Sequence, residues 1–188
     1  EIYKKDQENK NKNRNRMKIP FLRKENNLKG IFNFLQKDSN IEDEIKVTTS
    51  SYGGGDLHQL IQIENTDNNF YTNNENNPWI CFEFKKHKIV PTNYTIRSCN
   101  SYPGSRHPKS WIIEGSNDNK NWTKIDEQQN CSFLNGPKYL HTFSIKKIKE
   151  NNKEKEFKFI RIMHTNRSWD NYNNILNICS IEFYGELV

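Results

Sequence analysis

Two loop segments concentrate side chains that are suited to binding a ligand. The first supplies Tyr102, Arg106 and His107, and the second supplies Arg167, Trp169 and Tyr172. Aromatic faces beside guanidinium and amide groups suit a sugar ring and a protein hot spot equally well. We expect these six residues to contact a ligand. The alternative is a solvated loop with one Trp folded back onto the core.

The sequence contains none of the usual catalytic constellations. Its five His are scattered, it has no G-x-S-x-G motif, and no motif frames an acidic pair. The run Gly53-Gly54-Gly55 is followed by neither Lys-Ser/Thr nor a helix, so it does not match a phosphate-binding loop. The sequence therefore predicts that the protein is not an enzyme.

The excess positive charge lies in one segment. The chain of 188 residues has a formal net charge of +6. Residues 1–29 hold ten Lys/Arg and four Asp/Glu, and residues 30–188 hold nineteen of each. The body of the chain thus has no overall attraction for polyanions, and a nucleic-acid partner is not favoured. We predict a basic extension or linker over residues 1–27, and a folded domain over residues 28–188.

The four cysteines follow no metal-binding or redox pattern. They are Cys81, Cys99, Cys131 and Cys179, with no C-x-x-C pair and no His at a zinc-like spacing. We expect four reduced, unligated thiols. The sequence shows neither a signal peptide nor a membrane span, and together these features favour an intracellular, cytoplasmic or cytoskeletal location.

The secondary structure expected to position these loops is almost entirely β-strand. One helix is expected at 28–36, where Leu28, Ile31, Phe32 and Leu35 form an apolar stripe. Short runs rich in β-branched and aromatic residues then predict strands at 45–51, 58–63, 79–84, 93–98, 110–116, 122–126, 139–145, 157–163 and 177–184. Such a series predicts an all-β antiparallel jelly-roll sandwich over 45–185.

The core of that sandwich should be aromatic. The residues that we expect inside it are Trp79, Phe82, Trp111, Ile113, Trp122, Phe159 and Phe183. Arg161 shares a strand face with aromatic residues, so it should pair with an acidic group such as Glu182, and Gly115 should permit a bulge or a close backbone approach.

Four motifs occur in order between about residues 45 and 185. They are Pro78-Trp79-Ile80-Cys81-Phe82-Glu83-Phe84; the hairpin from Lys109-Ser110-Trp111 through Gly115-Ser116-Asn117-Asp118 to Trp122; Phe157-Lys158-Phe159-Ile160-Arg161-Ile162; and Ser180-Ile181-Glu182-Phe183-Tyr184-Gly185. This series resembles the discoidin family of coagulation factor V/VIII C-type domains, which has the galactose-binding-like fold. The helix ahead of it resembles intracellular members of the family in protists.

The resemblance implies where ligand and metal would lie. Members bind ligands with loops at one end of the sandwich, so the two loop segments should converge on one rim. Some carbohydrate-binding members hold a structural Ca²⁺, and Asp67, Thr72 and Glu182 are the matching oxygen donors in this sequence. The alternative for the segment around Asp67 is a turn held by its own hydrogen bonds. Apart from that calcium, no cofactor is expected.

Three functions compete. The leading hypothesis is a non-catalytic module that docks a protein partner through its end loops, within a larger cytoskeletal or adaptor assembly. The first alternative is a carbohydrate-binding module. The second is a polyanion-associated protein that uses the basic segment 1–29, which would show as a steep salt dependence.

Overall fold

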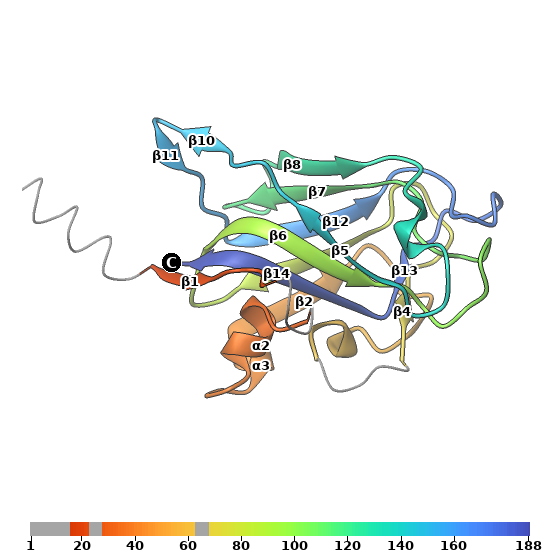
Figure 1. Cartoon of the computed structure of the whole chain (residues 1–188), viewed down its shortest axis with the longest axis horizontal. Coiled ribbons are helices and arrows are strands. Elements are labelled where there is room, and N and C mark those ends of the chain that lie inside the picture. Colours follow the sequence, from red (N-terminus) through yellow and green to blue (C-terminus); the bar gives the residue numbers. More distant parts are fainter. Residues whose placement is uncertain (1–15, 23–27, 63–67) are drawn as a thin grey trace, which may run out of the picture.

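The computed structural model describes residues 16–22, 28–62 and 68–188, and its core is a sandwich of two antiparallel sheets (Figure 1). The four-stranded sheet has the order β1-β14-β6-β9, formed by Met17–Ile19, Ser180–Leu187, Ile89–Arg97 and Leu140–Ser144. The five-stranded sheet has the order β2-β5-β12-β7-β8, formed by Ile45–Thr49, Trp79–Phe84, Phe159–His164, Trp111–Ser116 and Thr123–Gln128. The all-β sandwich expected from the sequence is confirmed.

Two small sheets lie at opposite ends of the sandwich. Three short strands, β3 (Gly54–Gly55), β4 (Phe70–Tyr71) and β13 (Asn177–Ile178), lie at one end. The hairpin β10–β11 (Lys149–Glu150 and Lys153–Glu154) projects from the other end, near the C-terminal residue (Figure 1). β13 falls within the strand expected at 177–184, but the other four were not expected, because runs of two residues are too short to show a period.

Alternation along the strands decides which aromatic residues enter the core. Phe82, Trp111, Ile113 and Phe183 are buried, as expected. Trp79, Trp122 and Phe159 are only half-buried. Trp79 and Phe159 immediately precede the inward-facing Ile80 and Ile160, so they point to the outer face of the five-stranded sheet. The expectation that these three belong to the core is wrong.

The outer face also holds Arg161, whose partner differs from the expected one. Its guanidinium donates two hydrogen bonds, of 2.9 and 2.6 Å, to Glu114 on the neighbouring strand. It lies 4.1 Å from the ring centroid of Trp122 and 5.9 Å from that of Trp79. Arg161 and Glu114 are register partners on β12 and β7, so the pair forms without crossing the sandwich to Glu182.

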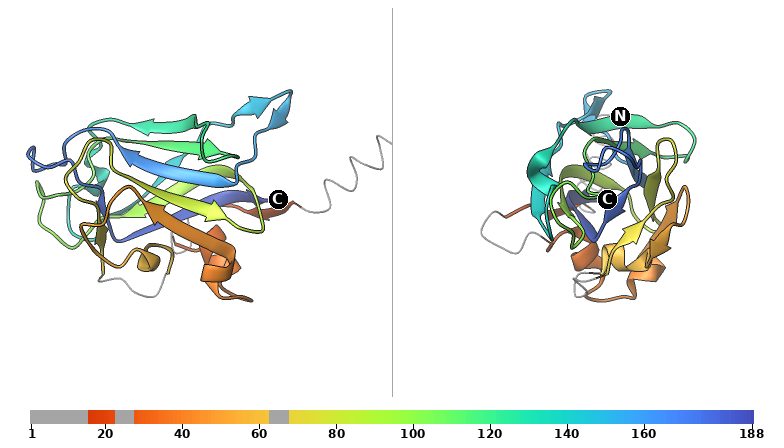
Figure 2. Two further views of the ribbon diagram at one scale, coloured as in Figure 1. Left: turned by 180° about the vertical axis from the view of Figure 1, so that it is seen from behind. Right: turned by 90° about the vertical axis from the view of Figure 1, so that its right-hand side faces the viewer.

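Helical turns cover one side of the sandwich, beside β2 and β14 (Figures 1 and 2). Helix α2 (Ile31–Leu35) lies in the segment where a helix was expected and buries Ile31, Phe32 and Leu35, also as expected. A second short helix, α3 (Ile41–Glu44), was not expected. The strand expected at 58–63 is instead a 3₁₀ helix, η1 (His58–Ile61). The Asp56 carboxylate accepts a hydrogen bond from the His58 N–H at 2.9 Å, which favours a turn over a strand.

Glu182 joins the last strand to the first helix. Its carboxylate accepts hydrogen bonds from the backbone N–H groups of Phe32 at 2.8 Å and Asn33 at 3.0 Å. Burial raises the pKa of Glu182 to about 7, although these N–H donors oppose the shift. The close approach requires Gly30, where a Cβ would lie 2.3 Å from the Phe183 carbonyl oxygen.

The described fold includes residues that were assigned to the extension. Strand β1 pairs with β14 through Met17, Lys18 and Ile19, so the boundary expected at residue 28 leaves out a strand. The rest of the expected basic extension, residues 1–15 and 23–27, lies outside the described residues. Among the residues that the structure does describe, no helix has the length and apolar character needed to cross a bilayer.

Candidate binding site at the loop end

Five loops gather at one end of the sandwich, on the right in Figure 1, and we call this region the loop end. They are residues 50–58, 72–78, 98–110, 129–139 and 165–176. They leave β2, β4, β6, β8 and β12 or lead into the strands that follow. The N-terminal strand β1, the C-terminal residue and the hairpin β10–β11 lie at the opposite end, which we call the terminal end (Figures 1 and 2).

Hydrogen bonds fix the order of the loops across this end. Loop 129–139 contacts loop 98–110, because the Asn135 side chain accepts from the Gly104 N–H at 2.7 Å. Loop 98–110 contacts loop 165–176, because the backbone N–H of Trp169 donates to the His107 carbonyl oxygen at 3.2 Å. Loop 165–176 contacts loop 72–78 through Asn174 and Asn74, and loop 72–78 in turn contacts loop 50–58.

The structure brings the two predicted loop segments together. Arg106 and Asp170 face each other across the boundary, with 4.0 Å between Nε and Oδ2. Tyr102 and Tyr172 are 76% and 83% exposed, so most of each ring is free to contact a partner. Arg167 is also exposed, and its guanidinium donates to the Asn171 carbonyl oxygen at 3.0 Å. These four side chains are accessible on the loop end.

His107 does not face a ligand. Its side chain is fully buried, with Nε2 3.1 Å from the carbonyl oxygens of Ser101 and Tyr102 and Nδ1 3.5 Å from the Cys99 sulfur. Burial lowers the pKa of His107, which favours the neutral ring. The expectation of a ligand contact is therefore wrong for this side chain. It instead stabilises the conformation of loop 98–110 through contacts with the backbone of the same loop.

Trp169 anchors one loop to another. It is half-buried, and its indole N–H donates to the Cys131 carbonyl oxygen at 3.2 Å. The Lys109 ammonium lies 4.9 Å from the centroid of its ring, which is cation–π distance. Trp169 thus ties loop 165–176 to both loop 129–139 and loop 98–110, and much of its ring contacts other parts of the protein rather than solvent.

Three further exposed aromatic residues lie outside the six predicted contact residues. Tyr52, Phe133 and Tyr139 are 60%, 59% and 46% exposed and lie in loops of the same end. Phe133 stacks on His141 with 4.0 Å between ring centroids. The sequence pattern predicts no element between the strands expected at 122–126 and 139–145, although Phe133 among Asn, Gly and Pro is a usable signal. The loop end therefore presents five exposed aromatic rings, counting Tyr102 and Tyr172.

Two of the three candidate calcium ligands already have other partners. Both carboxylate oxygens of Glu182 accept backbone N–H groups of α2, and the Thr72 hydroxyl accepts from the Leu176 N–H at 3.1 Å. Neither residue fits a metal ligand in this arrangement. Asp67 lies outside the described residues. Among the residues described, no group of three or more His, Cys, Asp or Glu is placed to hold a metal ion.

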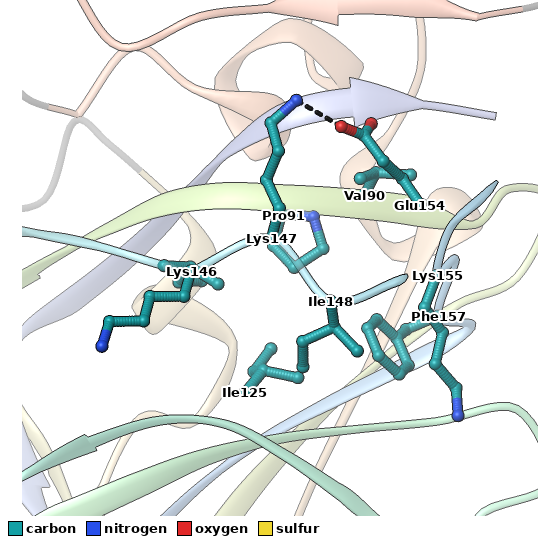
Figure 3. A pocket seen from close by; sticks show the side chains of 10 residues that line it. Val90, Pro91, Ile125, Lys146, Lys147, Ile148, Glu154, Lys155 and Phe157 are labelled. Atoms are coloured by element: carbon teal, nitrogen blue, oxygen red, sulfur yellow. Dashed lines mark hydrogen bonds and ion pairs between the residues drawn. The ribbon is translucent and has the colours of Figure 1, made fainter. Parts of the chain in front are cut away.

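The terminal end offers a weaker site. An open cleft of about 1110 Å³ lies there between the hairpin β10–β11 and the C-terminal residue, but polar and charged side chains line it, including those of Arg16, Glu154 and Glu156. A void beside it has the volume of about one water molecule, and the Ile148 side chain lies between Ile125 and Phe157 there (Figure 3). Among the described residues, this end has neither an exposed aromatic surface nor a ligand-sized apolar cavity.

Known proteins share this architecture. In a Clostridium perfringens module, CpGH89CBM32-5, solved with GalNAc-β-1,3-galactose, 95% of the chain superposes on 75% of this one with a TM-score of 0.56 at 14% identity. A fucolectin from striped bass (Morone saxatilis) serum gives a TM-score of 0.56 at 18% identity, covering 76% of this chain and 47% of the lectin. At these identities the likeness concerns the fold alone.

Sequence comparison identifies the family. The E3 ubiquitin-protein ligase Ufd4 of Drosophila melanogaster is 24% identical over 134 residues, which are 71% of this chain and 5% of that protein. The chain therefore spans only a small part of the length of this relative. The model of the F5/8 type C domain matches residues 44–181, most of the chain and nearly the whole sandwich. The chain belongs to the F5/8 type C domain family.

Proposed function

We propose that this chain is a non-catalytic binding module that docks a protein partner through its loop end. The observation that carries this proposal is the set of five exposed aromatic side chains, Tyr52, Tyr102, Phe133, Tyr139 and Tyr172, beside exposed Arg106 and Arg167. Tyrosine and arginine are enriched at protein–protein hot spots, because each combines apolar contact area with hydrogen-bonding groups.

The spread of these residues supports a protein over a single small molecule. They come from loops 50–58, 98–110, 129–139 and 165–176, so the surface extends over most of the end of the sandwich. A partner protein typically covers about 800 Å² of surface on each side of an interface. One sugar ring would contact only one or two of these aromatic residues.

A carbohydrate ligand is the second candidate. The CpGH89CBM32-5 module was solved with GalNAc-β-1,3-galactose, and a related Clostridium perfringens module, from NanJ, was solved with galactose. An exposed Tyr with Arg and Asn nearby, as around Tyr102 and Tyr172, would also suit a sugar face.

The test compares one variant in two binding assays. The double variant Tyr102→Ala/Tyr172→Ala should fold with an unchanged melting temperature, because both rings are mostly exposed. In a capture experiment from the native cell, read by mass spectrometry, it should lose the partner that the unmodified chain retains. A glycan array with galactose- and GalNAc-terminated probes is run alongside. If the unmodified chain binds such glycans, and no captured protein is lost in the double variant, the carbohydrate ligand replaces the protein partner as the proposed function.

We also propose an intracellular location. The four cysteines are buried and form no disulfide in the structure, which suits a reducing compartment. Thiol titration of the natively produced protein, under denaturing and non-reducing conditions, should find four free thiols. Two or fewer would contradict this location.

A further inference from the structure

Charge is distributed unevenly across the loop end. The three contiguous loops 98–110, 129–139 and 165–176, which we call the three-loop face, contain Arg106, Lys109, Lys138 and Arg167 but only one acidic residue, Asp170. The described loops on the other side, 50–58 and 72–78, contain no Lys or Arg and carry Asp56 and Glu75. A net charge of +3 thus lies next to one of −2, inside a body that is neutral overall.

The arginines of the three-loop face have donor groups to spare. Arg106 is 54% exposed, and its nearest carboxylate oxygen, on Asp170, is 4.0 Å away. That carboxylate is itself occupied, since it accepts from the N–H groups of Tyr172 and Asn173 at 3.0 Å. Arg167 donates one hydrogen bond, to a neutral carbonyl oxygen. A guanidinium has five N–H donors and pairs well with a carboxylate. Both side chains can therefore donate hydrogen bonds to a carboxylate of a partner molecule.

Exposed aromatic rings lie among these cations. Tyr102 and Phe133 belong to the same two loops that supply Arg106 and Lys138, and Tyr172 belongs to the loop that supplies Arg167. The rings offer apolar contacts between the charges. The complementary ligand is therefore a chain that alternates carboxylate side chains with apolar or aromatic ones.

We infer that the three-loop face binds an acidic, aromatic-containing segment of a protein partner. This inference rests on the proposed function and names the chemistry of the partner. It favours a peptide over an anionic membrane, because a flat membrane would contact the whole loop end and bring Asp56 and Glu75 against its own negative charge. A peptide segment can follow the basic half alone.

The experiment uses defined polymers as probes. Binding of the full chain to a fluorescent copolymer of Glu and Tyr is measured by anisotropy, with polylysine and phosphatidylserine-containing vesicles as comparisons. The copolymer should bind, and its affinity should fall as salt screens the charges beyond the Debye length of about 10 Å at 0.1 M. Arg106→Gln/Arg167→Gln should weaken binding at least about tenfold, equivalent to about 1.4 kcal/mol.

A matched control removes the same charge elsewhere. Lys146→Gln/Lys153→Gln takes two exposed cations from the terminal end, so it lowers the net charge equally and should leave binding unchanged. Equal losses in the two double variants would show unspecific attraction and overturn the inference, as would tighter binding to the vesicles than to the copolymer. If the Tyr102→Ala/Tyr172→Ala variant loses the cellular partner while the arginine variant keeps it, the inference fails and the proposed function stands.

Discussion

At the terminal end Arg16 and Lys147 pair with carboxylates of their own chain, whereas at the loop end the Arg106 guanidinium lies 4.0 Å from its nearest carboxylate oxygen. Arg16 contacts Glu156 at 2.5 Å and Glu186 at 3.0 Å, and Lys147 pairs with Glu154 (Figure 3). Arg167 at the loop end donates to a carbonyl oxygen instead. Internal pairing joins strands to one another, while spare donors are available to a partner. Under the proposed function, the same residue types serve stability at one end and binding at the other.

The largest expected effect comes from Trp169, which both stabilises the loops and lies on the proposed binding surface. Trp169→Ala removes a half-buried ring and its hydrogen bond to Cys131, so the free energy of unfolding should fall by about 2–3 kcal/mol, and binding should fall with it. Denaturant unfolding followed by circular dichroism measures the first effect. Tyr102→Ala is the control and should stay within about 0.5 kcal/mol of the unmodified protein. Normal stability with a selective loss of binding would make Trp169 a contact residue, as the sequence first suggested.

The second prediction concerns the terminal end. Arg16→Met should lower the free energy of unfolding by about 1 kcal/mol, because Glu156 and Glu186 lose a partly buried partner. Affinity for the Glu–Tyr copolymer should not change. Lys146→Met, at an exposed cation of the same end with no ion pair among the described residues, is the control. A loss of affinity in Arg16→Met would erase the distinction between the two ends.

A smaller effect is expected at Asp170, the acidic residue of the three-loop face. Burial tends to raise its pKa, but hydrogen bonds from Asn173 and Tyr172 outweigh this and lower it. A lowered pKa in the folded state adds stability at neutral pH, which is lost as the pH falls through about 4 and below. Asp170→Asn should flatten this acid dependence in pH-resolved unfolding. It should also raise copolymer affinity about two- to threefold, by removing the carboxylate nearest Arg106. An affinity below that of the unmodified protein would contradict the electrostatic account.

The smallest expected effect is that of calcium. Glu182 and Thr72 are occupied by N–H donors, so millimolar Ca²⁺ or a chelator should leave the melting temperature unchanged. A ligand at 100 times its dissociation constant would add about 2.7 kcal/mol of stability. A clear rise in melting temperature with Ca²⁺, absent with Mg²⁺, would show that the loop end is held by a metal rather than by its own contacts.

Local period and local motif predicted the fold well. The alternation around Phe82 and the Trp111 hairpin gave the main strands, and the stripe with Ile31 and Phe32 gave α2. The errors arose where long-range contacts decide the outcome. Nothing local shows that Arg161 would meet Glu114 or that Glu182 would receive the N–H groups of α2.

The candidate site was predicted less well than the fold. Residue type alone proposed Tyr102, Arg106, Arg167 and Tyr172, which are all exposed at the loop end. It could not separate them from His107, because solvent exposure depends on which backbone carbonyl groups surround a side chain. It also missed Phe133, because a single aromatic residue in a polar loop forms no periodic pattern.

The position of β14 affects how the chain folds during synthesis. β14 is the strand nearest the C-terminal end of this sequence, yet it pairs with β1 and β6 and supplies the Glu182 carboxylate to α2. Residues near the beginning must therefore wait for residues made some 150 positions later before their partners exist. Domains made at about 5–20 residues per second leave such edges exposed for several seconds or more. A nascent chain that stops short of β14 should be a substrate for chaperones.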